Sequence, residues 1–462
     1  MDQLNTESAR LRKSVAAGTL GKGERKEKEK EQEQEQEQEQ ERERELEREK
    51  EKEVNGKPMV QKHMGGTDHP AGPAKYGAAM QVVRIVVFAV YFLISAMFIH
   101  GAQLLGVPLY FVNKDYFYAW VALTKQYFGL LAVQCTKWFS PTVVRISGDS
   151  SIRQQLHQLQ DGRVQCDFPE RLVMIANHQI YTEWLYLWWI AYTAGMHGHI
   201  YIILKESLKY VPVLGPGMML FNFIFMSRKW ATDQARMRYR LQKLNTRHSG
   251  PMTGSSDATQ LDPMWLLIFP EGTNLSPNTR KRSQAYSEKS GIPDMKHTVL
   301  PRTTGLQFCL QELRNTVEYV YDCTIGYEVV PPGEYAGGIY TIRSVYLEGR
   351  PPKSVNMHWR RFKVSDIPAD DVDKMQAWTL QRWREKDEII QTFLDTGRFP
   401  ADEEAAKIEE PGKIGPYIET EVRPAFPWEW LQMFVPVIAA TLVGKILIKL
   451  VNSATTGRMS DD

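Results

Sequence analysis

The sequence predicts a mixed α/β protein, in which a twisted sheet is flanked by helices, with an N-terminal membrane helix or helical hairpin and a C-terminal membrane helix. Short β-prone runs alternate with helical stretches from about residue 141 onward, which is the pattern of an α/β sheet. Two apolar segments near the ends of the chain have the length of a bilayer crossing. These observations indicate a globular part held at a membrane.

Residues 1–80 are expected to form a charged tail that contributes nothing to a core. From Gly23 to about Val54 the sequence is almost only Glu, Lys, Gln and Arg, with too few apolar side chains to offset the entropy of ordering. This run is therefore predicted to be disordered or a solvated helix. The formal net charge is +2, and acids and bases are mixed within the same run, so nucleic-acid binding is not expected.

The region 81–140 is predicted to enter the membrane. From Ile85 to Val112 there is no Asp, Glu, Lys or Arg, and the segment exceeds the roughly 20 residues that cross a bilayer. The aromatic-rich stretch from Tyr116 to Phe139 is interrupted by Lys125, which suits a second helix in a hairpin with the first. A hairpin would leave the N-terminus and the globular part on one side of the membrane, whereas a single span would separate them. The sequence leaves both open, with a buried core helix as a further alternative for the first segment.

Residues 426–452 are predicted to form the C-terminal membrane helix. Leu431 to Leu450 is apolar except for Gln432, Lys445 and Lys449. The two lysines lie near one end, where their long side chains can reach the interface. A helix that lies on the surface or packs within the protein is the alternative.

The globular part begins near Pro141 with strands and helices in alternation. The predicted strands are "VVRISGD", "RLVMIANH", "HIYIILK", "NFIFMSR", "MWLLIFPEG" and "VYDCTIGY". Helices are predicted at "TEWLYLWWIAYTAG", at "ATDQARMRYRLQKLN" and from Asp370 to Thr396. Further strands are expected within "IYTIRSVYLEGRPPKSVNMHWRRFKV", and the polar insertion Ser249–Asp262 is expected to be a surface loop.

The cysteines point to no metal site. Cys135, Cys166, Cys309 and Cys323 are scattered and lack the close spacing of zinc ligands. They are expected to be free, buried thiols in a reducing compartment.

His178 and Glu183 form the first candidate for chemistry. They stand five residues apart, which on a regular helix would set them about 140° from each other. They can meet if His178 leaves a strand and Glu183 lies in the first turn of the next helix, with Thr182 as its cap. A carboxylate on one imidazole nitrogen would fix the tautomer and leave the other nitrogen to take a proton from a hydroxyl. The alternative is a capping carboxylate beside an ordinary turn histidine.

Three later runs also end in polar residues. Arg228 ends "FIFMSR" and has the forked, always-charged donors that suit a phosphate. The turn Glu271-Gly272-Thr273 follows in "IFPEGTN", and Pro301 and Arg302 follow an apolar run in "VLPRTTG". Each is ordinary alone, but ligands of open α/β sheets collect at the carboxyl ends of strands.

The four blocks "NHQIYTE", "IFMSR", "IFPEGTN" and "VLPRTTG" resemble, in order and spacing, the motif blocks of the glycerolipid acyltransferase superfamily, 1-acylglycerol-3-phosphate acyltransferase type. The stretches "WLYLWW", "YIILKESLKYVPVLGPGM" and "YDCTIGY" are similar to its lysocardiolipin and lysophosphatidylinositol acyltransferase branch, fungal members in particular. The resemblance covers about Arg84 to Thr396. We number these the first to fourth blocks.

The resemblance implies direct transfer of an acyl chain from acyl-CoA to the free hydroxyl of a lysophospholipid, with His178 as the general base. No bound cofactor, metal or covalent acyl-enzyme is implied, and acyl-CoA is a co-substrate. The family's first block ends in aspartate where this chain has Glu183. The longer side chain needs a different rotamer, and a misplacement near 1 Å can cost on the order of a hundredfold in rate.

The same resemblance implies roles for the other blocks. Arg228 and the turn at Glu271, Gly272 and Thr273 would contact the phosphate of the acceptor. Pro301 would shape the wall made by the fourth block. Lys205 is added as a second cation near the head group.

The resemblance also implies an organisation for the chain. The acyltransferase catalytic domain would span 141–335 and its C-terminal part 336–400, followed by a linker at 401–425 and a tail at 453–462. The partners would be acyl-CoA, a lysophospholipid and the bilayer, in the endoplasmic reticulum membrane; the oligomeric state stays open. Because CoA is in water and the cysteines are expected to be reduced, the catalytic domain is predicted to face the cytosol, and the hairpin is favoured. Lysophosphatidylinositol or lysocardiolipin is favoured as acceptor, with lysophosphatidate next. The alternatives are a CoA-independent phospholipid transacylase and a non-catalytic membrane scaffold on the same fold.

Overall fold

The computed structural model describes residues 69–246, 260–402 and 417–458. The charged run Gly23–Val54 and most of the predicted loop Ser249–Asp262 lie outside these residues. The elements below belong to one compact unit that extends from Gly66 to Asp462.

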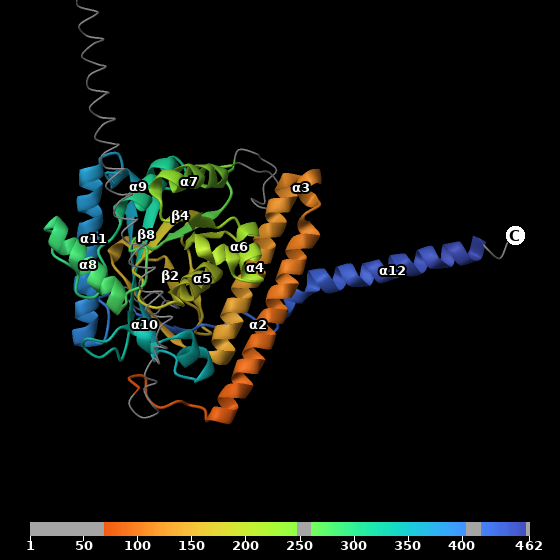
Figure 1. Ribbon diagram of the computed structural model, residues 1–462, viewed down its shortest axis with the longest axis horizontal. Coiled ribbons are helices and arrows are strands. Elements are labelled where there is room, and N and C mark those ends of the chain that lie inside the picture. The colour runs from red at the N-terminus through yellow and green to blue at the C-terminus, as the bar shows by residue number, and fades with distance from the viewer. Residues whose placement is uncertain (1–68, 247–259, 403–416, 459–462) are drawn as a thin grey trace, which may run out of the picture. The chain divides into compact units, whose positions relative to one another are not determined.

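An eight-stranded mixed sheet forms the centre of this unit, in the order β10-β1-β9-β8-β4-β7-β5-β6 (Figure 1). Its strands are β1 (Val143–Gly148), β4 (Arg171–Ala176), β5 (Ile200–Lys205), β6 (Ile224–Met226), β7 (Met264–Ile268), β8 (Tyr319–Tyr327), β9 (Ser354–Lys363) and β10 (Ile418–Glu421). Strands β8, β4, β7, β5 and β6 are parallel neighbours, while β9 runs antiparallel to β8 and β10 antiparallel to β1. The predicted α/β class with a mixed, twisted sheet is confirmed. A separate small ladder pairs β2 (Leu156–Gln158) with β3 (Val164–Cys166).

Helices cover both faces of the sheet because alternate strand residues are apolar on each side. In β4, Leu172 and Met174 pack into one core, and Val173 and Ile175 pack into the other. The first core lies under α4 (Lys114–Phe139) and α5 (Glu183–Thr193), and the second lies under α7 (Trp230–Leu244), α9 (Thr303–Leu313) and α11 (Val372–Thr396). Further helical elements are η1 (Ser150–Ile152), η2 (Glu206–Tyr210), α6 (Leu214–Leu220), α8 (Pro277–Ser290), α10 (Ala336–Ile339), η4 (Val364–Asp366) and η6 (Glu429–Phe434).

The N-terminal helices form an antiparallel pair. Helix α2 (Ala78–Gly106) turns through α3 (Leu109–Val112) and packs along α4 (Figure 1). Arg84, near the start of α2, donates to the carbonyl of Phe139 at the end of α4 over 2.7 Å, and Trp120 of α4 donates to the carbonyl of Ala102. The second predicted helix therefore exists, but it is mostly buried between α2 and α5. Its apolar side chains pack into the hydrophobic core on one face of the sheet, which explains why it is as apolar as an interfacial helix.

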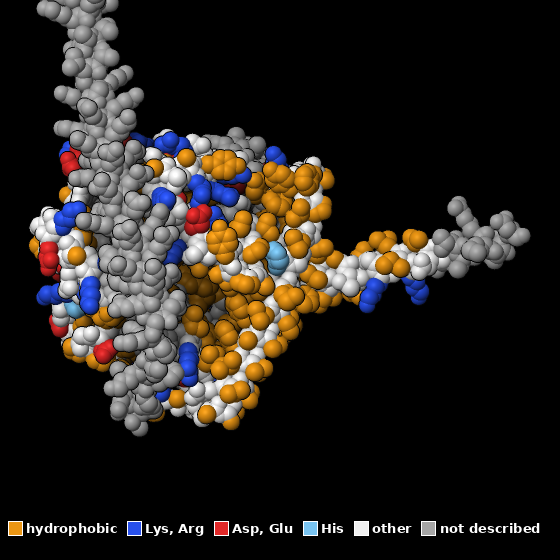
Figure 2. Space-filling model, viewed as in Figure 1, with side chains coloured by type: hydrophobic (Ala, Val, Ile, Leu, Met, Phe, Trp, Pro, Cys, Tyr) orange, Lys and Arg blue, Asp and Glu red, His pale blue; other side chains and the backbone are white. Residues whose placement is uncertain are grey.

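Two helical segments are long and apolar enough to cross a membrane, Ala78–Val112 and Glu429–Asn452. The second belongs mainly to α12 (Val435–Arg458). Most of both segments is exposed, and Figure 2 shows hydrophobic side chains gathered over α2 and along α12. Large exposed apolar surface of this kind marks a membrane or a partner, so the two helices indicate membrane association.

The structure differs from the predicted elements in two places. Residues Arg343–Leu347 form a π-helical turn, η3, where strand was expected, because Arg84 of α2 binds the carbonyls of Tyr346 and Leu347 and tertiary contacts override β propensity. Strand β9 forms later in the same stretch, as expected, and lies between β1 and β8, so the ranges 336–400 and 141–335 share one sheet. Strand β10 lies within the expected linker 401–425. The four cysteines are free and buried, as predicted.

Candidate active site

His178 stands where the chain leaves β4 at the carboxyl edge of the sheet, the edge at which the parallel strands β4 to β8 end. The preceding residue, Asn177, is fully buried and binds the backbone of Ile325 in β8 through both its amide oxygen and its amide nitrogen. The carbonyl of His178 accepts over 2.7 Å from the backbone N–H of Leu275, the residue directly after the third block. The loop is therefore fixed from both neighbouring strands.

Glu183 binds His178 across the loop, as predicted. Its Oε2 lies 2.6 Å from Nδ1 of His178, and its carboxylate also accepts from the backbone N–H groups of Gln179 and Ile180. The phenol of Tyr327, at the end of β8, donates to Oε1 over 3.1 Å. The Glu183 side chain is fully buried, so these donors replace its hydration. The carboxylate is locked in one orientation.

The capping of α5 differs from the expected arrangement. Thr182 occupies the cap position, but its hydroxyl oxygen is buried and has no hydrogen-bond partner among the residues that the structure describes. Glu183, the first residue of the helix, reaches back to the loop amides instead. A glutamate can do this because its extra methylene lets the carboxylate fold back over its own helix end.

The imidazole of His178 has one nitrogen left for substrate. Nδ1 is occupied by Glu183, and Nε2 makes no hydrogen bond within the described parts of the chain. The ring stacks on Phe269 with centroids 4.4 Å apart, and about a fifth of the side chain (19%) is exposed. A base that is oriented on one nitrogen and accessible on the other is suited to deprotonate a hydroxyl.

Glu271 of the third block points into the protein. Its side chain is buried and accepts from Nε1 of Trp383 in α11 over 3.1 Å. Burial raises the pKa of this carboxyl well above its usual value and the charge of Glu183 raises it further, against the opposing effects of Trp383 and Lys386. The side chain is therefore turned inward, and the phosphate contact expected for Glu271, Gly272 and Thr273 stays a prediction.

The exposed part of the turn is Gly272, with Thr273 half-buried after it. Gly272 has φ +70°, a conformation that favours glycine. Its N–H binds the carbonyl of Phe269, and its carbonyl accepts from Nη2 of Arg228 over 3.2 Å. The second and third blocks are thus joined at one glycine.

Arg228 is held in a strained backbone conformation at the end of β6. Its φ is +68°, which costs a non-glycine residue of order 1 kcal/mol or more. The turn is stabilised by Asp233 in α7, whose Oδ1 accepts from both the N–H and the hydroxyl of Ser227 over 2.9 Å. Asp233 is fully buried, so it fixes the turn while the Arg228 side chain stays exposed.

The two remaining predicted residues lie at the same edge. Lys205 ends β5 opposite Met226 of β6, and its exposed side chain makes no hydrogen bond or ion pair within the described residues. Pro301 is half-buried in the fourth block. The next residue, Arg302, binds the carbonyl of Pro270 through its backbone N–H over 2.7 Å, which joins the fourth block to the third.

Helix α11 fixes the loop that leads into the fourth block. The carboxylate of Asp387 accepts from the backbone N–H groups of Lys296, His297 and Thr298, which lead into the fourth block. Gln179 of the first block donates to the carbonyl of His297 over 3.4 Å. The C-terminal part of the chain therefore fixes a loop that contacts the first block.

Sequence reasoning missed Asn177, Tyr327, Phe269, Asp233 and Trp383. Asn177 adjoins His178, Phe269 lies within the third block and Tyr327 ends a predicted strand, so position alone could have indicated these three. Asp233 and Trp383 lie within helices and carry no local signal. Only tertiary contact brings them to the site.

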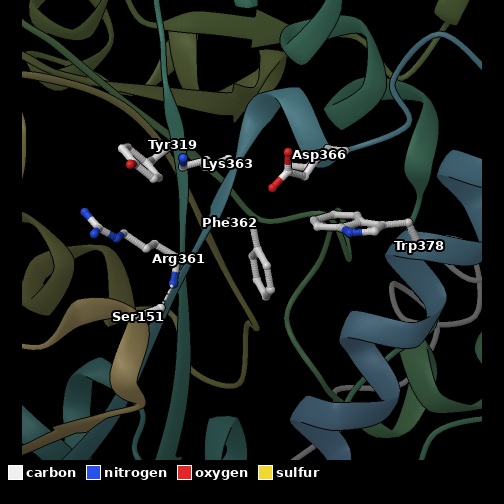
Figure 3. A pocket seen from close by; sticks show the side chains of 8 residues that line it. Ser151, Tyr319, Arg361, Phe362, Lys363, Asp366 and Trp378 are labelled. Atoms are coloured by element: carbon white, nitrogen blue, oxygen red, sulfur yellow. Dashed lines mark hydrogen bonds between the residues drawn. The ribbon is translucent and has the colours of Figure 1, made fainter.

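A separate pocket of about 340 Å³ lies at the other edge of the sheet (Figure 3). It is lined by the start of β8 and the end of β9, where the Arg361 guanidinium lies 4.4 Å from the ring centre of Tyr319. Phe362 and Trp378 lie on the other side of β9 from that guanidinium and pack edge-on against each other (Figure 3). Tyr327, which binds Glu183, is at the opposite end of β8. This pocket does not belong to the His178 site.

Comparison with known proteins gives matches over most of the sheet and its helices, including all four blocks. Residues 144–328 match the family described as "Acyltransferase", and residues 346–418 match "Acyltransferase C-terminus". An uncharacterized acyltransferase of Schizosaccharomyces pombe is 39% identical over 318 residues, covering 69% of this chain and 87% of the relative. A 2-acyl-1-lysophosphatidylinositol acyltransferase of Saccharomyces cerevisiae is 39% identical over 304 residues, covering 61% and 77%. Lysocardiolipin acyltransferase 1 of Danio rerio is 34% identical over 246 residues, covering 52% and 58%.

Proposed function

Because this chain belongs to the acyltransferase family of lysophospholipid and 1-acylglycerol-3-phosphate acyltransferases, we propose that it transfers an acyl chain from acyl-CoA to the free hydroxyl of a lysophospholipid. The observation that carries the proposal is the His178–Glu183 pair at the carboxyl edge of the sheet, with one imidazole nitrogen oriented and the other open. The arginine of the second block lies at the adjacent turn and supplies positive charge for a phosphate.

The proposed reaction is direct transfer. Nε2 of His178 takes the proton of the acceptor hydroxyl as its oxygen attacks the thioester carbonyl of acyl-CoA. The new C–O bond forms, the C–S bond breaks, and the CoA thiolate takes the proton from the imidazolium. Glu183 stabilises the imidazolium between these steps, because its carboxylate is already fixed by Tyr327 and the loop amides and need not reorganise.

The phosphate of the acceptor is proposed to bind at the turn between the second and third blocks. Arg228 presents a guanidinium there, and Gly272 lets a ligand approach the backbone closely because it has no side chain. Thr273 supplies a hydroxyl, Lys205 is a second cation at the same edge, and Pro301 shapes the wall of the fourth block. No bound cofactor or metal takes part in this scheme.

Lysophosphatidylinositol is proposed as the preferred acceptor, followed by lysocardiolipin and then lysophosphatidate. The support is that this chain is 39% identical to a yeast lysophosphatidylinositol acyltransferase, against 34% for a lysocardiolipin acyltransferase and 33% for a probable 1-acylglycerol-3-phosphate acyltransferase. An assay of purified protein with radiolabelled acyl-CoA and a panel of lysolipids tests this order. Preference for lysophosphatidate would overturn the ranking. If a donor phospholipid without acyl-CoA gave as much product as acyl-CoA does, the protein would be a transacylase and the acyl-CoA reaction would be wrong.

The protein is proposed to act at the cytosolic face of the endoplasmic reticulum membrane, with α2 and α4 as a hairpin. The support is the burial of α4 between α2 and the catalytic core, since a helix packed there cannot leave the domain to cross the bilayer alone. Acyl-CoA is water-soluble and lysolipids partition into the bilayer, so an interfacial site suits both.

A labelling experiment tests this orientation. The native cysteines are buried, so a single Glu288→Cys substitution on the exposed face of α8 gives one accessible thiol. A membrane-impermeant maleimide should label it in sealed, right-side-out microsomes without detergent. Labelling only after detergent would contradict a cytosolic catalytic domain.

A further inference from the structure

Arg302 of the fourth block lies against the same glycine that binds Arg228. A Cβ atom placed on Gly272 would stand 3.6 Å from Cδ and 3.8 Å from Nε of Arg302, so the Arg302 side chain runs past Gly272 at van der Waals distance. Arg228 reaches the carbonyl of that glycine from β6. Two arginine side chains from different strand ends therefore reach the same exposed turn.

The position of Arg302 is fixed by its backbone. Its N–H binds the carbonyl of Pro270 over 2.7 Å, directly before the turn, and α9 begins at the next residue. Its side chain is exposed and makes no hydrogen bond or ion pair with any residue that the structure describes. A cation that is anchored at its base and has no carboxylate partner in these residues is available to a ligand.

The neighbouring carboxyl does not neutralise this pair of cations. Glu271 adjoins Gly272, but its side chain is buried and bound to Trp383. Two cationic side chains that reach one turn attract an anion placed there. Paired guanidinium forks match the geometry of phosphate oxygens.

We propose that Arg302 and Arg228 form a two-arginine phosphate site over Gly272, with Arg302 as a substrate-binding residue. The proposal rests on the acyltransferase function and adds a residue from the fourth block to the phosphate contacts of the second and third. The phosphate group of the lysophospholipid is the occupant we favour. The phosphates of CoA share the same chemistry, and kinetics separate the two sources.

The kinetic test compares full-length wild type with Arg302→Ala, Arg302→Lys and the control Arg314→Ala. Arg314 is exposed at the other end of α9 and pairs with Asp370, so its loss removes the same charge far from the turn. KM is measured for lysophosphatidylinositol at saturating acyl-CoA, and for acyl-CoA at saturating lysolipid. Arg302→Ala should raise one KM by about tenfold or more with kcat changed less, since a hydrogen bond to a charged group is lost.

The outcomes have distinct meanings. A rise in KM for the lysolipid supports the proposal and assigns its phosphate to the site, and a rise for acyl-CoA supports it and assigns the phosphates of CoA. Arg302→Lys should be intermediate because lysine keeps the charge without the fork. If both KM values of Arg302→Ala match those of wild type and Arg314→Ala, the proposal is wrong while the acyltransferase function stands.

A binding readout works without turnover. Millimolar inorganic phosphate should raise the melting temperature of detergent-solubilised wild type and Arg314→Ala, by mass action on the folded state. The shift should shrink in Arg302→Ala. Equal shifts in all three proteins would contradict the two-arginine phosphate site, whether or not a substrate for transfer is found. An inactive wild-type protein would instead count against the acyltransferase function alone.

Discussion

Nδ1 of His178 lies 2.6 Å from Oε2 of Glu183, although five residues separate the two in the chain and Glu183 is the first residue of α5. The contact exists because His178 is still in the loop after β4, while the helix brings the carboxylate back toward that loop. The same carboxylate accepts from two loop amides and from Tyr327. Glutamate therefore fills the place of the family's aspartate with a full set of donors.

We expect Glu183→Gln to lose most of the rate and Glu183→Asp to keep more of it. Glutamine cannot stabilise an imidazolium by charge, and its NH2 group would face donors that now point at the carboxylate. Aspartate keeps the charge but is one methylene shorter, so we expect a loss of up to about a hundredfold from misplacement. Steady-state kcat at saturating substrates checks this, and a glutamine variant as active as wild type would show that charge at this position is not needed.

Tyr327→Phe should lower kcat about fivefold and leave the shape of its pH profile unchanged. The substitution removes one donor to Glu183, worth about 1 kcal/mol. Burial and the charge of Glu183 raise the pKa of Tyr327 well above its usual value, so the wild-type phenol stays protonated over the working pH range and the substitution removes no group that titrates there. The matched control is Tyr340→Phe, whose hydroxyl binds the carbonyl of Glu328 and not the dyad. A changed alkaline limb in Tyr327→Phe would contradict this account.

Glu271→Gln should be at least as stable as wild type near neutral pH. The pKa of Glu271 is raised by burial and by Glu183, so the folded state keeps a proton that the unfolded state releases above about pH 4.3. The contribution of Glu271 to the free energy of unfolding of wild type is therefore greatest below that pH, and it falls as the pH rises toward the pKa of Glu271 in the folded protein. Glutamine does not titrate and removes this fall. The melting temperature of the variant minus that of wild type should be larger at pH 7.5 than at pH 5. A variant that is less stable than wild type by the same amount at both pH values would show that Glu271 is ionised in the folded protein.

Asp233→Ala should raise KM for the lysolipid about tenfold, with a smaller change in kcat. The alanine leaves the N–H and hydroxyl of Ser227 without their acceptor, so the turn that holds Arg228 at positive φ loosens. Asp233→Asn keeps one oxygen acceptor and should recover part of the loss. Asp373→Asn, in the exposed first turn of α11, serves as the control. An unchanged KM in Asp233→Ala would show that Asp233 does not position Arg228.

Local patterns predicted the strands and the meeting of His178 with Glu183, because each depends on a few consecutive residues. The apolar runs of β4, β5, β7 and β8 form strands as expected, and the polar residue after each lies at the shared carboxyl edge. The order of the four blocks also indicated the family, which the comparisons confirm.

Long-range contacts could not be predicted in this way. Trp383 binds Glu271 from a helix that is 112 residues away in sequence, and this contact turns the carboxyl inward. The π-helical turn at Arg343–Leu347 likewise depends on Arg84 of a distant helix. Arg302 was visible in the fourth block, but its approach to Gly272 follows from the fold alone.

The most direct test of the central claim is the initial rate of acyl transfer from radiolabelled acyl-CoA to lysophosphatidylinositol by purified wild type and His178→Ala. His178 is partly exposed and does not hold the core, so the variant should fold, which its melting temperature verifies. We predict transfer by wild type and a loss of at least about a hundredfold in the variant, the size of a general-base contribution. Equal transfer by a folded His178→Ala protein would contradict the claim that His178 and Glu183 carry the reaction.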